Sequence, residues 1–492
     1  MKIEIAATPV DQIQTDLLVV LLDQETELAQ YAGTVLEPLL APLAAEFENK
    51  KIKREYFSRF QGGIQHLLIF HSNLDSNYNL WEKVKIFAAK ALGYGKDFNL
   101  TRITFLLNGK DSGPYVGKVA EGVILGSYSF EKYKKEKSSY NSELSVSLVV
   151  TASSQEESQG RLAHYQLVSE AINEAREIVN EPGEKVYPEI LAGLARQIGA
   201  EFNLQVNVMD EKALAAEGYP GLIAVGKGSK YPPRLITLEY QPAKESKVRL
   251  ALVGKGVTFD TGGISIKPSD KMLEMKGDMA GAAAVLYAMK VIAQLKPGIQ
   301  VMGIIPAAEN FPDANAQRPG DIFVAKNGKS IQVDNTDAEG RLILTDALWL
   351  AGEGKATHIL DVATLTGAAV RALGQGYAAI MGNSQELINA VIHSGKNHGE
   401  SFWQLPLPPE YKEMLKTPFA DINNVGGSYG GAIAGGLFLQ EFVPENTPWA
   451  HLDIAGPFFF DKPWKYYKEG GTGFGLKTFV DLCERFGEYF PG

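Results

Sequence analysis

Short apolar runs alternate with amphipathic segments along most of this 492-residue chain. The apolar runs have the length of strands, whereas the segments between them repeat their apolar residues with the period of a helix. Such alternation is typical of α/β proteins, in which helices cover a sheet. In the first third of the chain it predicts strands at Ile3–Ile5, Leu17–Leu22, His66–Phe70, Ile103–Leu107 and Leu144–Val150.

The alternation pauses once, and the pause predicts two domains. Thr151–Gly160 is polar and rich in Ser, Glu and Gln, and a long amphipathic helix is expected after it, at Arg161–Val179. We therefore expect a smaller N-terminal α/β domain over 1–155, a linker helix over 156–184, and a larger C-terminal α/β domain over 185–492 with a mixed central sheet flanked by helices.

Further helices and strands can be predicted along the chain, and the loops between them are candidates for functional segments. Loops that connect the elements of a rigid sheet are a common place for functional residues. Helices are expected at Trp81–Leu92, Val116–Leu125, Asp278–Leu295 and Leu342–Ala351, and further strands at Val248–Val253, Val301–Ile305 and His358–Val362.

Composition limits the partners and the kinds of metal site. The 48 basic and 58 acidic residues give a net charge of −10, so the whole chain is not attracted to nucleic acid or to an anionic membrane. With one cysteine, Cys483, it can form neither an intrachain disulfide nor a multi-cysteine zinc site. The seven histidines are scattered, so a bound metal would depend mainly on carboxylates.

The N-terminal segment predicts neither export nor insertion into a membrane. It reads MKIEIAATPVDQIQTDLL, with polar residues every few positions, unlike a signal peptide. Its longest apolar run, Leu17–Leu22, is far shorter than the ~20 residues of a membrane-spanning helix. We expect a cytoplasmic protein, or one of an organelle stroma if a transit peptide has been removed.

Three stretches in the second half place charged residues where a strand ends or a helix begins. In the first, Val253–Gly263, an apolar strand leads into Lys255 and Asp260 and then into a glycine turn, with Lys267 shortly after. The glycines permit a sharp turn and the close approach of a ligand. A surface turn with a Lys–Asp pair is the simpler alternative.

The second stretch, Met275–Ala284, places Asp278 at the start of a predicted helix. Taken alone, Asp278 is well explained as an N-cap, because the free N–H groups and the dipole of a helix N-terminus favour a carboxylate. The small residues from Gly281 to Ala284 would let this helix pack closely on the sheet.

The third stretch, Asp334–Leu342, carries two carboxylates and an arginine at alternate positions. In an extended chain Asp337, Glu339 and Arg341 would face the same side, whereas a helix would separate Asp337 and Glu339 by about 200°. Gly340 and the helical pattern after it suggest a turn from a strand into a helix. A surface Asp–Arg pair is the alternative.

Together the stretches offer four carboxylates, Asp260, Asp278, Asp337 and Glu339, without histidine or cysteine. Such oxygen ligands suit Mg²⁺, Mn²⁺ or Zn²⁺. Packed together without a metal, the carboxylates would repel one another, and some of their pKa values would rise. Two divalent ions would neutralise them, and ions about 3.5–4 Å apart activate a bridging water and polarise a carbonyl or phosphoryl oxygen.

These stretches, including the NTDAEGRL of Asn335–Leu342, resemble the leucyl aminopeptidase family of cytosolic two-metal aminopeptidases. The resemblance is strong over roughly 165–492 and weak before it. It implies a hexameric hydrolase that releases N-terminal residues from peptides, preferentially leucine and similar apolar residues, by attack of a water or hydroxide that bridges two metals. Further matching segments, in the expected order, are Asn180–Pro182, Pro232–Tyr240, Asp361–Gly367 and His451–Gly456.

The resemblance assigns metal ligands residue by residue. It implies that Asp260 and Glu339 bridge two divalent ions, Mn²⁺ or Zn²⁺, while Lys255 and Asp278 complete the tighter site. Asp337 would complete the more exchangeable site. As a ligand Lys255 must be neutral, which costs about 4 kcal/mol at neutral pH, and an adjacent dication readily supplies that amount.

The resemblance also assigns catalytic and pocket residues. Lys267 would polarise the scissile carbonyl, and Arg341 would hold a bicarbonate ion that carries a proton from water to the leaving amine. An apolar pocket would favour Leu or Met by ~2–3 kcal/mol, although the bulky Pro457–Phe460 departs from the usual family pattern. The implied pocket residues are Met275, Thr364, Gly367, Ala455 and Phe458.

Three rival interpretations fit the sequence less well. Gly426–Gly430 matches the Gly-x-Ser-x-Gly elbow of serine hydrolases, but Ala420–Val425 before it is too polar for a buried strand, and His451 precedes Asp453. A two-metal phosphoesterase would be expected to use histidines, which the three stretches lack. A binding protein that kept only the fold would not need all seven proposed metal and catalytic residues.

Overall fold

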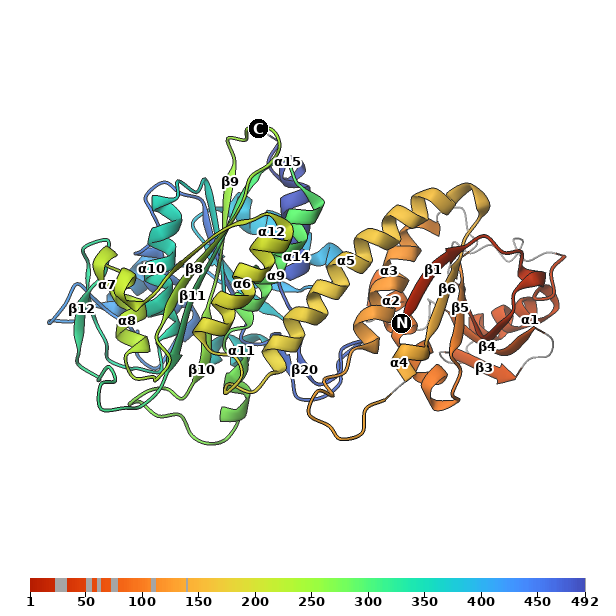
Figure 1. Cartoon of the computed structure of the whole chain (residues 1–492), viewed down its shortest axis with the longest axis horizontal. Coiled ribbons are helices and arrows are strands. Elements are labelled where there is room, and N and C mark those ends of the chain that lie inside the picture. The colour runs from red at the N-terminus through yellow and green to blue at the C-terminus, as the bar shows by residue number, and fades with distance from the viewer. Residues whose placement is uncertain are drawn as a thin grey trace. The chain divides into compact units, whose positions relative to one another are not determined.

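The computed structural model describes residues 1–22, 33–49, 55–59, 63–71, 78–107, 112–138 and 140–491. The chain forms two compact units, each with its own sheet and helices, which confirms the expected α/β class (Figure 1). The first unit comprises Met1–Glu170 and Lys462–Lys468, and the second comprises Ala171–Asp461 and Glu469–Gly492.

The first unit is built on a six-stranded sheet in the order β1-β6-β5-β2-β4-β3. All neighbouring strands are parallel except β3, which is antiparallel to β4. The five strands expected from the sequence are confirmed, and β3 was not foreseen. The strands are β1 (Lys2–Ala6), β2 (Thr15–Leu22), β3 (Glu55–Arg59), β4 (Ile64–His71), β5 (Arg102–Leu106) and β6 (Ser145–Val149).

Helices cover this sheet, and β2 shows that both of its faces are buried. All residues of β2 are buried, with Leu17, Val19 and Leu21 in one apolar cluster and Leu18 and Val20 in another. Continuous apolar runs of this kind are typical of parallel strands with helices on both faces. The helices of the unit are α1 (Glu37–Glu48), α2 (Leu80–Asp97), α3 (Ser112–Ser127), α4 (Tyr140–Glu143) and the first part of α5 (Gln155–Asn180).

The two compact units do not have the same boundaries as the predicted domains. The contacts within the chain define these units, and the domain boundaries themselves remain a prediction. The units part within α5, between Glu170 and Ala171, and the first unit also takes in Lys462–Lys468, which the sequence placed in the larger domain. An ion pair connects this segment to the rest of the first unit: Lys465 Nζ lies 2.9 Å from Glu82 Oε2. Because Glu82 and Lys465 are far apart in the sequence, the sequence around either residue does not predict this contact.

The second unit is built on a nine-stranded mixed sheet in the order β16-β15-β18-β14-β9-β11-β8-β7, with β10 paired to β11. The inner strands β18, β14, β9 and β11 are parallel, whereas β15 and β8 are antiparallel to their inner neighbours. This confirms the mixed central sheet. Its strands are β7 (Gln205–Met209), β8 (Arg234–Tyr240), β9 (Arg249–Gly254), β10 (Gly256–Asp260), β11 (Gln300–Asn310), β14 (His358–Ala363), β15 (Ala378–Gly382), β16 (Phe402–Gln404) and β18 (Trp449–Asp453).

Helices α9 (Ala280–Leu295) and α10 (Gly340–Glu353) pack on opposite faces of this sheet (Figure 1). Helices α6 (Pro188–Phe202) and α14 (Leu476–Glu484) pack beside α9, and α8 (Pro220–Gly226) and α13 (Gly431–Gln440) beside α10. The remaining elements are α7 (Glu211–Glu217), α11 (Gly367–Leu373), α12 (Gln385–His398), α15 (Phe486–Tyr489), β12 (Ile322–Val324), β13 (Ser330–Gln332), β17 (Ile422–Asn423), β19 (Phe459–Phe460) and β20 (Gly470–Gly471).

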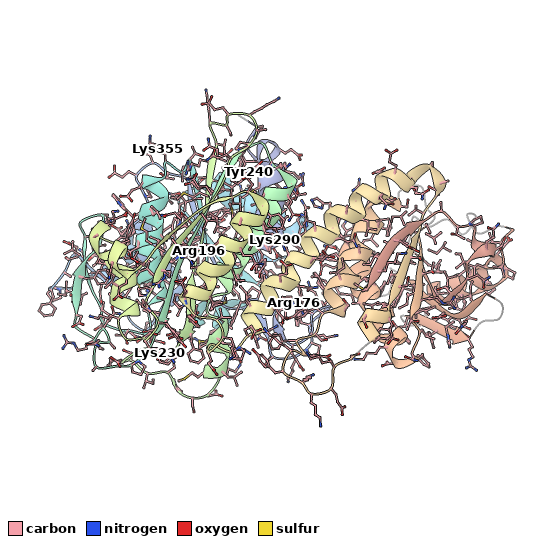
Figure 2. The ribbon with its side chains drawn as sticks, viewed as in Figure 1. Arg176, Arg196, Lys230, Tyr240, Lys290 and Lys355 are labelled. Atoms are coloured by element: carbon pink, nitrogen blue, oxygen red, sulfur yellow. The ribbon has the colours of Figure 1, made fainter. Side chains whose placement is uncertain are left out.

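Polar contacts fasten the second part of α5 to the rest of the second unit (Figure 2). Lys290 Nζ on α9 lies 2.7 Å from Glu174 Oε2, and Arg176 Nε donates to the carbonyl of Gly471 at 2.9 Å. Arg176 is fully buried, so its hydrogen bonds compensate for the loss of water around the guanidinium.

One helical span among the described residues, Met272–Leu295, passes a length and composition test for crossing a membrane. Of its most apolar window, 83% is buried inside the protein. It contains α9, whose apolar surface is therefore explained by packing on the sheet.

Helix α9 packs very closely on the sheet, as its run of small residues predicted. A Cβ on Gly281 would overlap the carbonyl oxygen of Val362 and lie 3.0 Å from the amide nitrogen of Lys255. A Cβ on Gly254 would in turn lie 2.5 Å from the carbonyl oxygen of Gly281. Both glycines therefore set the distance between α9 and the strands β9 and β14.

We expect Gly281→Ala to lower the free energy of unfolding by about 2–3 kcal/mol, because a methyl group here meets backbone that cannot move aside. Urea unfolding followed by circular dichroism measures the change. Gly193→Ala is the matched control, since Gly193 also lies within a helix but has open space around its Cβ position. That variant should be neutral or more stable, and equal destabilisation by both variants would contradict the close-packing argument.

Candidate active site

The predicted site residues gather where parallel strands of the second unit end. Lys255 follows β9, Asp260 ends β10, Thr364 follows β14, and Ala455 and Phe458 follow β18. Because β9, β11, β14 and β18 are parallel, their carboxyl ends meet at one edge of the sheet. Ligand sites of open α/β sheets commonly lie at this edge.

A cavity of about 550 Å³ lies at this edge. No histidine is among the described residues that line it, in agreement with a site based on carboxylates. Of the twelve predicted site residues, only Arg341 is absent from its walls. The other eleven line the cavity: Lys255, Asp260, Lys267, Met275, Asp278, Asp337, Glu339, Thr364, Gly367, Ala455 and Phe458.

Lys255 is the centre of the more buried half of the charged cluster. Its Nζ lies 2.8 Å from Asp278 Oδ2 and 2.9 Å from Glu339 Oε1, and it donates to the carbonyl of Thr364 at 3.0 Å. Only 2% of Lys255 is exposed. A Cβ on Gly340 would lie 2.7 Å from this Nζ, so a glycine at the start of α10 makes room for the lysine.

Lys267 connects the two carboxylates of the more open half. Its Nζ lies 2.7 Å from Asp260 Oδ2 and 2.5 Å from Asp337 Oδ1. One oxygen each of Asp260, Asp337 and Glu339 can be chosen so that all lie within 4.8 Å of one another. Residues from the first and third stretches thus come together as the sequence analysis expected.

The N-cap interpretation of Asp278 is wrong. Helix α9 begins at Ala280, its N-cap is Met279, and no side chain caps it. The carboxylate of Asp278 instead contacts Lys255 and accepts a hydrogen bond of 2.6 Å from the hydroxyl of Thr364. The long-range pairing with a lysine replaces the local hydrogen bond that the sequence position alone suggested.

The third stretch is not extended, so the expectation that its three charged side chains share one side is wrong for Arg341. The chain turns at Thr336–Asp337, and Glu339 adopts helical backbone angles directly before α10. Arg341 lies one step into that helix. Its Nη1 donates to the carbonyl of Asn424 at 2.7 Å, and its guanidinium carbon lies 6.0 Å from the ring centre of Phe438.

Burial and mutual repulsion raise the pKa values of three carboxyl groups. Burial raises the pKa of Asp260 well above its usual range and that of Asp278 to about 6, with a further contribution from Glu339 in each case. The same two causes raise the pKa of Asp337. Burial also disfavours ionisation of Glu339, but Lys255 and Lys267 outweigh it and hold the pKa of Glu339 below its ordinary value.

The donor set fits divalent cations. Four carboxylates face two ammonium groups, so two negative charges stay uncompensated when all six groups are ionised. Oxygen Oε2 of Glu339 is buried and accepts no hydrogen bond from any described residue, so it keeps a lone pair for a cation. Surrounding carboxylates raise the pKa of Lys255 above its ordinary value against the effect of burial, and ligation by Lys255 would therefore release a proton.

Three buried side chains that the sequence analysis missed hold the cluster in place. Asn310 donates from Nδ2 to Asp260 Oδ1 at 2.8 Å and to the carbonyl of Thr336 at 3.0 Å. Asn424 donates to the carbonyl of Asn335 at 2.7 Å. Each bond joins residues at least 26 positions apart, and a local pattern carries no signal for such contacts.

Asp453 is the third of these side chains, and it fixes the loop after β14. Its Oδ2 accepts a hydrogen bond of 2.7 Å from the hydroxyl of Thr366, and its Oδ1 accepts from the backbone amides of Leu365 and Ala455 at 3.1 and 3.2 Å. This loop carries Thr364, which contacts both Lys255 and Asp278. Asp453 therefore positions one wall of the cavity without lining it.

The structure also excludes the serine-hydrolase elbow. Ser428 lies in an exposed loop, and the residues before it form only the two-residue strand β17. His451 is fully buried in β18 and lies 2.5 Å from Asp361 Oδ1, whose other oxygen accepts from Trp449 Nε1 at 2.7 Å. His451 is thus engaged inside the sheet and is unable to serve Ser428.

Known proteins are similar to this chain in both sequence and fold. Residues 173–480 match the family model described as "Cytosol aminopeptidase family, catalytic domain". A probable cytosol aminopeptidase of Solibacter usitatus is 41% identical over 98% of this chain and 99% of its own length. One of Aquifex aeolicus is 46% identical over 74% of this chain and 73% of its own length.

Two solved structures are similar over nearly the whole chain. A mutant of tomato leucine aminopeptidase superposes with a TM-score of 0.85 at 32% identity, over 99% of this chain and 96% of that one. The bottromycin maturation enzyme BotP, in complex with Mn, superposes with a TM-score of 0.82 at 30% identity, over 96% of this chain and 99% of that one. The predicted family and the predicted hydrolase activity are thereby confirmed, and the chain belongs to the cytosol aminopeptidase family.

Proposed function

We propose that this chain is a two-metal aminopeptidase that releases N-terminal leucine and similar apolar residues from peptides. The observation that carries the proposal is the cluster of four carboxylates and two lysines that lines the cavity of about 550 Å³. Asp260 and Glu339 would bridge two divalent ions, Lys255 and Asp278 would complete one site, and Asp337 the other. Bound there, Mn²⁺ or Zn²⁺ would activate a water molecule and polarise the scissile carbonyl.

The carboxylates also explain a preference for free N-termini. A protonated α-amino group is attracted to these carboxylates, and a neutral one has a lone pair for a metal ion that they hold, whereas an acylated N-terminus offers neither. Lys267 lies between Asp260 and Asp337, which raise its pKa above the ordinary value and keep it cationic. It would therefore donate a hydrogen bond to the carbonyl oxygen of the scissile bond as negative charge develops there.

Arg341 would serve as an anion site for bicarbonate. Its Nη1 is engaged with Asn424, but its Nε is buried and donates to no residue that the structure describes. Burial lowers the pKa of Arg341 to about 10, so the guanidinium stays charged at neutral pH. Arg341 would hold this anion, which would supply a proton relay between water and the leaving amine.

The apolar part of the cavity supports a preference for leucine and methionine. Met275, Thr364, Gly367, Ala455 and Phe458 would form the pocket for the first side chain, and all of them line the cavity. Burial of a leucine-sized side chain there would contribute ~2–3 kcal/mol. The second aromatic residue at the wall, Phe459, lies within the Pro457–Phe460 segment that departs from the family pattern.

We also propose that the chain acts in the cytoplasm and that it associates with further copies of itself. Several large apolar side chains of the second unit are exposed in the single chain, including Ile266 (58%), Leu273 (71%) and Phe419 (73%). Contact with further copies of the chain would remove them from water. We expect light scattering to give the mass of a hexamer.

Hydrolysis of a leucyl anilide by the Mn²⁺-loaded chain tests the proposed activity. We expect turnover of the free amine substrate and none of N-acetyl-leucyl anilide, which differs only in its blocked amino group. Absence of turnover by metal-loaded protein would overturn the proposal. Equal turnover of both substrates would overturn the role of the free N-terminus.

A further inference from the structure

Arg371 is a charged residue at the cavity that the proposed mechanism does not use. It lies on α11, is exposed, and lines the cavity with Lys271, Glu274 and Gln375. Lys271 and Glu274 partly neutralise each other, since Lys271 opposes the rise that burial causes in the pKa of Glu274. The described residues provide neither an ion pair nor a hydrogen bond to Arg371, so its charge is available to a molecule that enters the cavity.

The helix places this guanidinium beside Gly367. Residues four apart lie on the same face of a helix, and Gly367 is the first residue of α11. A Cβ on Gly367 would lie 3.6 Å from Arg371 Nη1. The guanidinium therefore lies close to a residue of the proposed side-chain pocket.

The distance from the charged cluster suits a short substrate. Thr364, whose carbonyl accepts a hydrogen bond from Lys255, is three residues before Gly367, so at most about 11 Å separate the two Cα atoms. An extended dipeptide spans about 7 Å. This bound exceeds the span of a dipeptide by about one residue's length, so a short substrate whose amino group lies at the carboxylates is the kind that can place a carboxylate of its own near Arg371.

We propose that Arg371 binds a carboxylate of the substrate and makes the enzyme selective for short peptides that carry one near the N-terminus. This inference rests on the proposed aminopeptidase function. A guanidinium pairs with a carboxylate through two parallel hydrogen bonds, a geometry that lysine lacks. The carboxylate can come from the C-terminus of a dipeptide, which is compatible with leucine at the first position, or from an acidic side chain at the first position, which would replace the leucine preference of the proposed function.

Two pairs of substrates separate these sources. Leucyl-leucine and leucyl-leucinamide differ only in the terminal carboxylate, and glutamyl anilide and glutaminyl anilide differ only in the side-chain carboxylate. We expect the wild-type chain to favour the carboxylate member of at least one pair. In Arg371→Met that preference, measured as a ratio of kcat/KM values, should fall about fivefold through a higher KM, since the ion pair is solvent-exposed. Arg371→Lys should retain only part of the preference for the carboxylate substrate, because lysine keeps the charge but lacks the paired donors of arginine.

Arg196→Met is the matched control, because it removes the same charge from an exposed arginine of α6 that lies outside the cavity walls (Figure 2). Its substrate ratios should equal those of the wild type. Equal ratios in Arg371→Met and the wild type for both pairs would overturn this inference, as would a loss that affects neutral and acidic substrates alike. Absence of hydrolysis of every substrate by the metal-loaded wild type would overturn the proposed function and this inference together.

Discussion

Replacing Glu339 with glutamine is expected to remove bound metal and to lower kcat/KM for a leucyl anilide by about a thousandfold, or ~4 kcal/mol. Glu339 is 2% exposed, and its Oε2 accepts no hydrogen bond from the described residues. The amide of glutamine is similar in size but lacks the charge that a bridging ligand must supply. Metal content by mass spectrometry and activity are to be measured on the same sample.

The matched control is Glu386→Gln, at an exposed position in the first turn of α12. It changes the net charge equally and should keep both metal and activity. Retained metal stoichiometry together with retained activity in Glu339→Gln would overturn the assignment of the metal site. Comparable unfolding midpoints of the two metal-free variants would show that the loss does not come from misfolding.

Replacing Lys267 with methionine is expected to lower kcat about a hundredfold while the metals stay bound. The proposed role of Lys267 is to stabilise charge on the substrate oxygen, and loss of one such donor costs about 10²–10³ in rate. Its removal also takes a positive charge away from Asp260 and Asp337, to which it is 2.5–2.7 Å distant. Affinity for divalent cations should therefore be unchanged or higher.

An unchanged metal content together with a lower kcat would distinguish Lys267 from the proposed metal ligands. Steady-state kinetics and metal content of Lys267→Met are compared with those of Lys212→Met, which changes an exposed lysine of α7 outside the cavity. Loss of metal in Lys267→Met would assign the lysine to assembly of the site. An unchanged kcat would remove it from the mechanism.

The sequence predicted strands at several apolar runs that are buried on both sides, although the buried strands β8 and β15 were not predicted. Strand β2 is one of the predicted strands, with its side chains alternating between two apolar clusters. Strand β3 escaped notice because its side chains are only half-buried and polar residues interrupt it. Strand β18 was not predicted either, since it contains the polar residues His451 and Asp453, whose partners Asp361 and Thr366 lie about 90 residues away.

The charged residues of the site could be predicted because they stand next to recognisable strand ends. Glycines and carboxylates at strand ends are visible in the sequence, and family resemblance attached roles to them. The orientation of Arg341 was missed because it depends on a turn at Thr336–Asp337 and on a carbonyl 83 residues away, at Asn424. Arg371 left no signal because its proposed role depends on a cavity that only the folded chain forms.

Stoichiometric reloading with Mn²⁺ tests the central claim most directly. The chain is stripped with a chelator and titrated with Mn²⁺, while bound manganese per chain and hydrolysis of a leucyl anilide are measured together. We predict that activity disappears on chelation and returns in full only when two ions are bound per chain. Hydrolysis that persists in the stripped chain, or full activity with a single ion bound, would contradict the two-metal account.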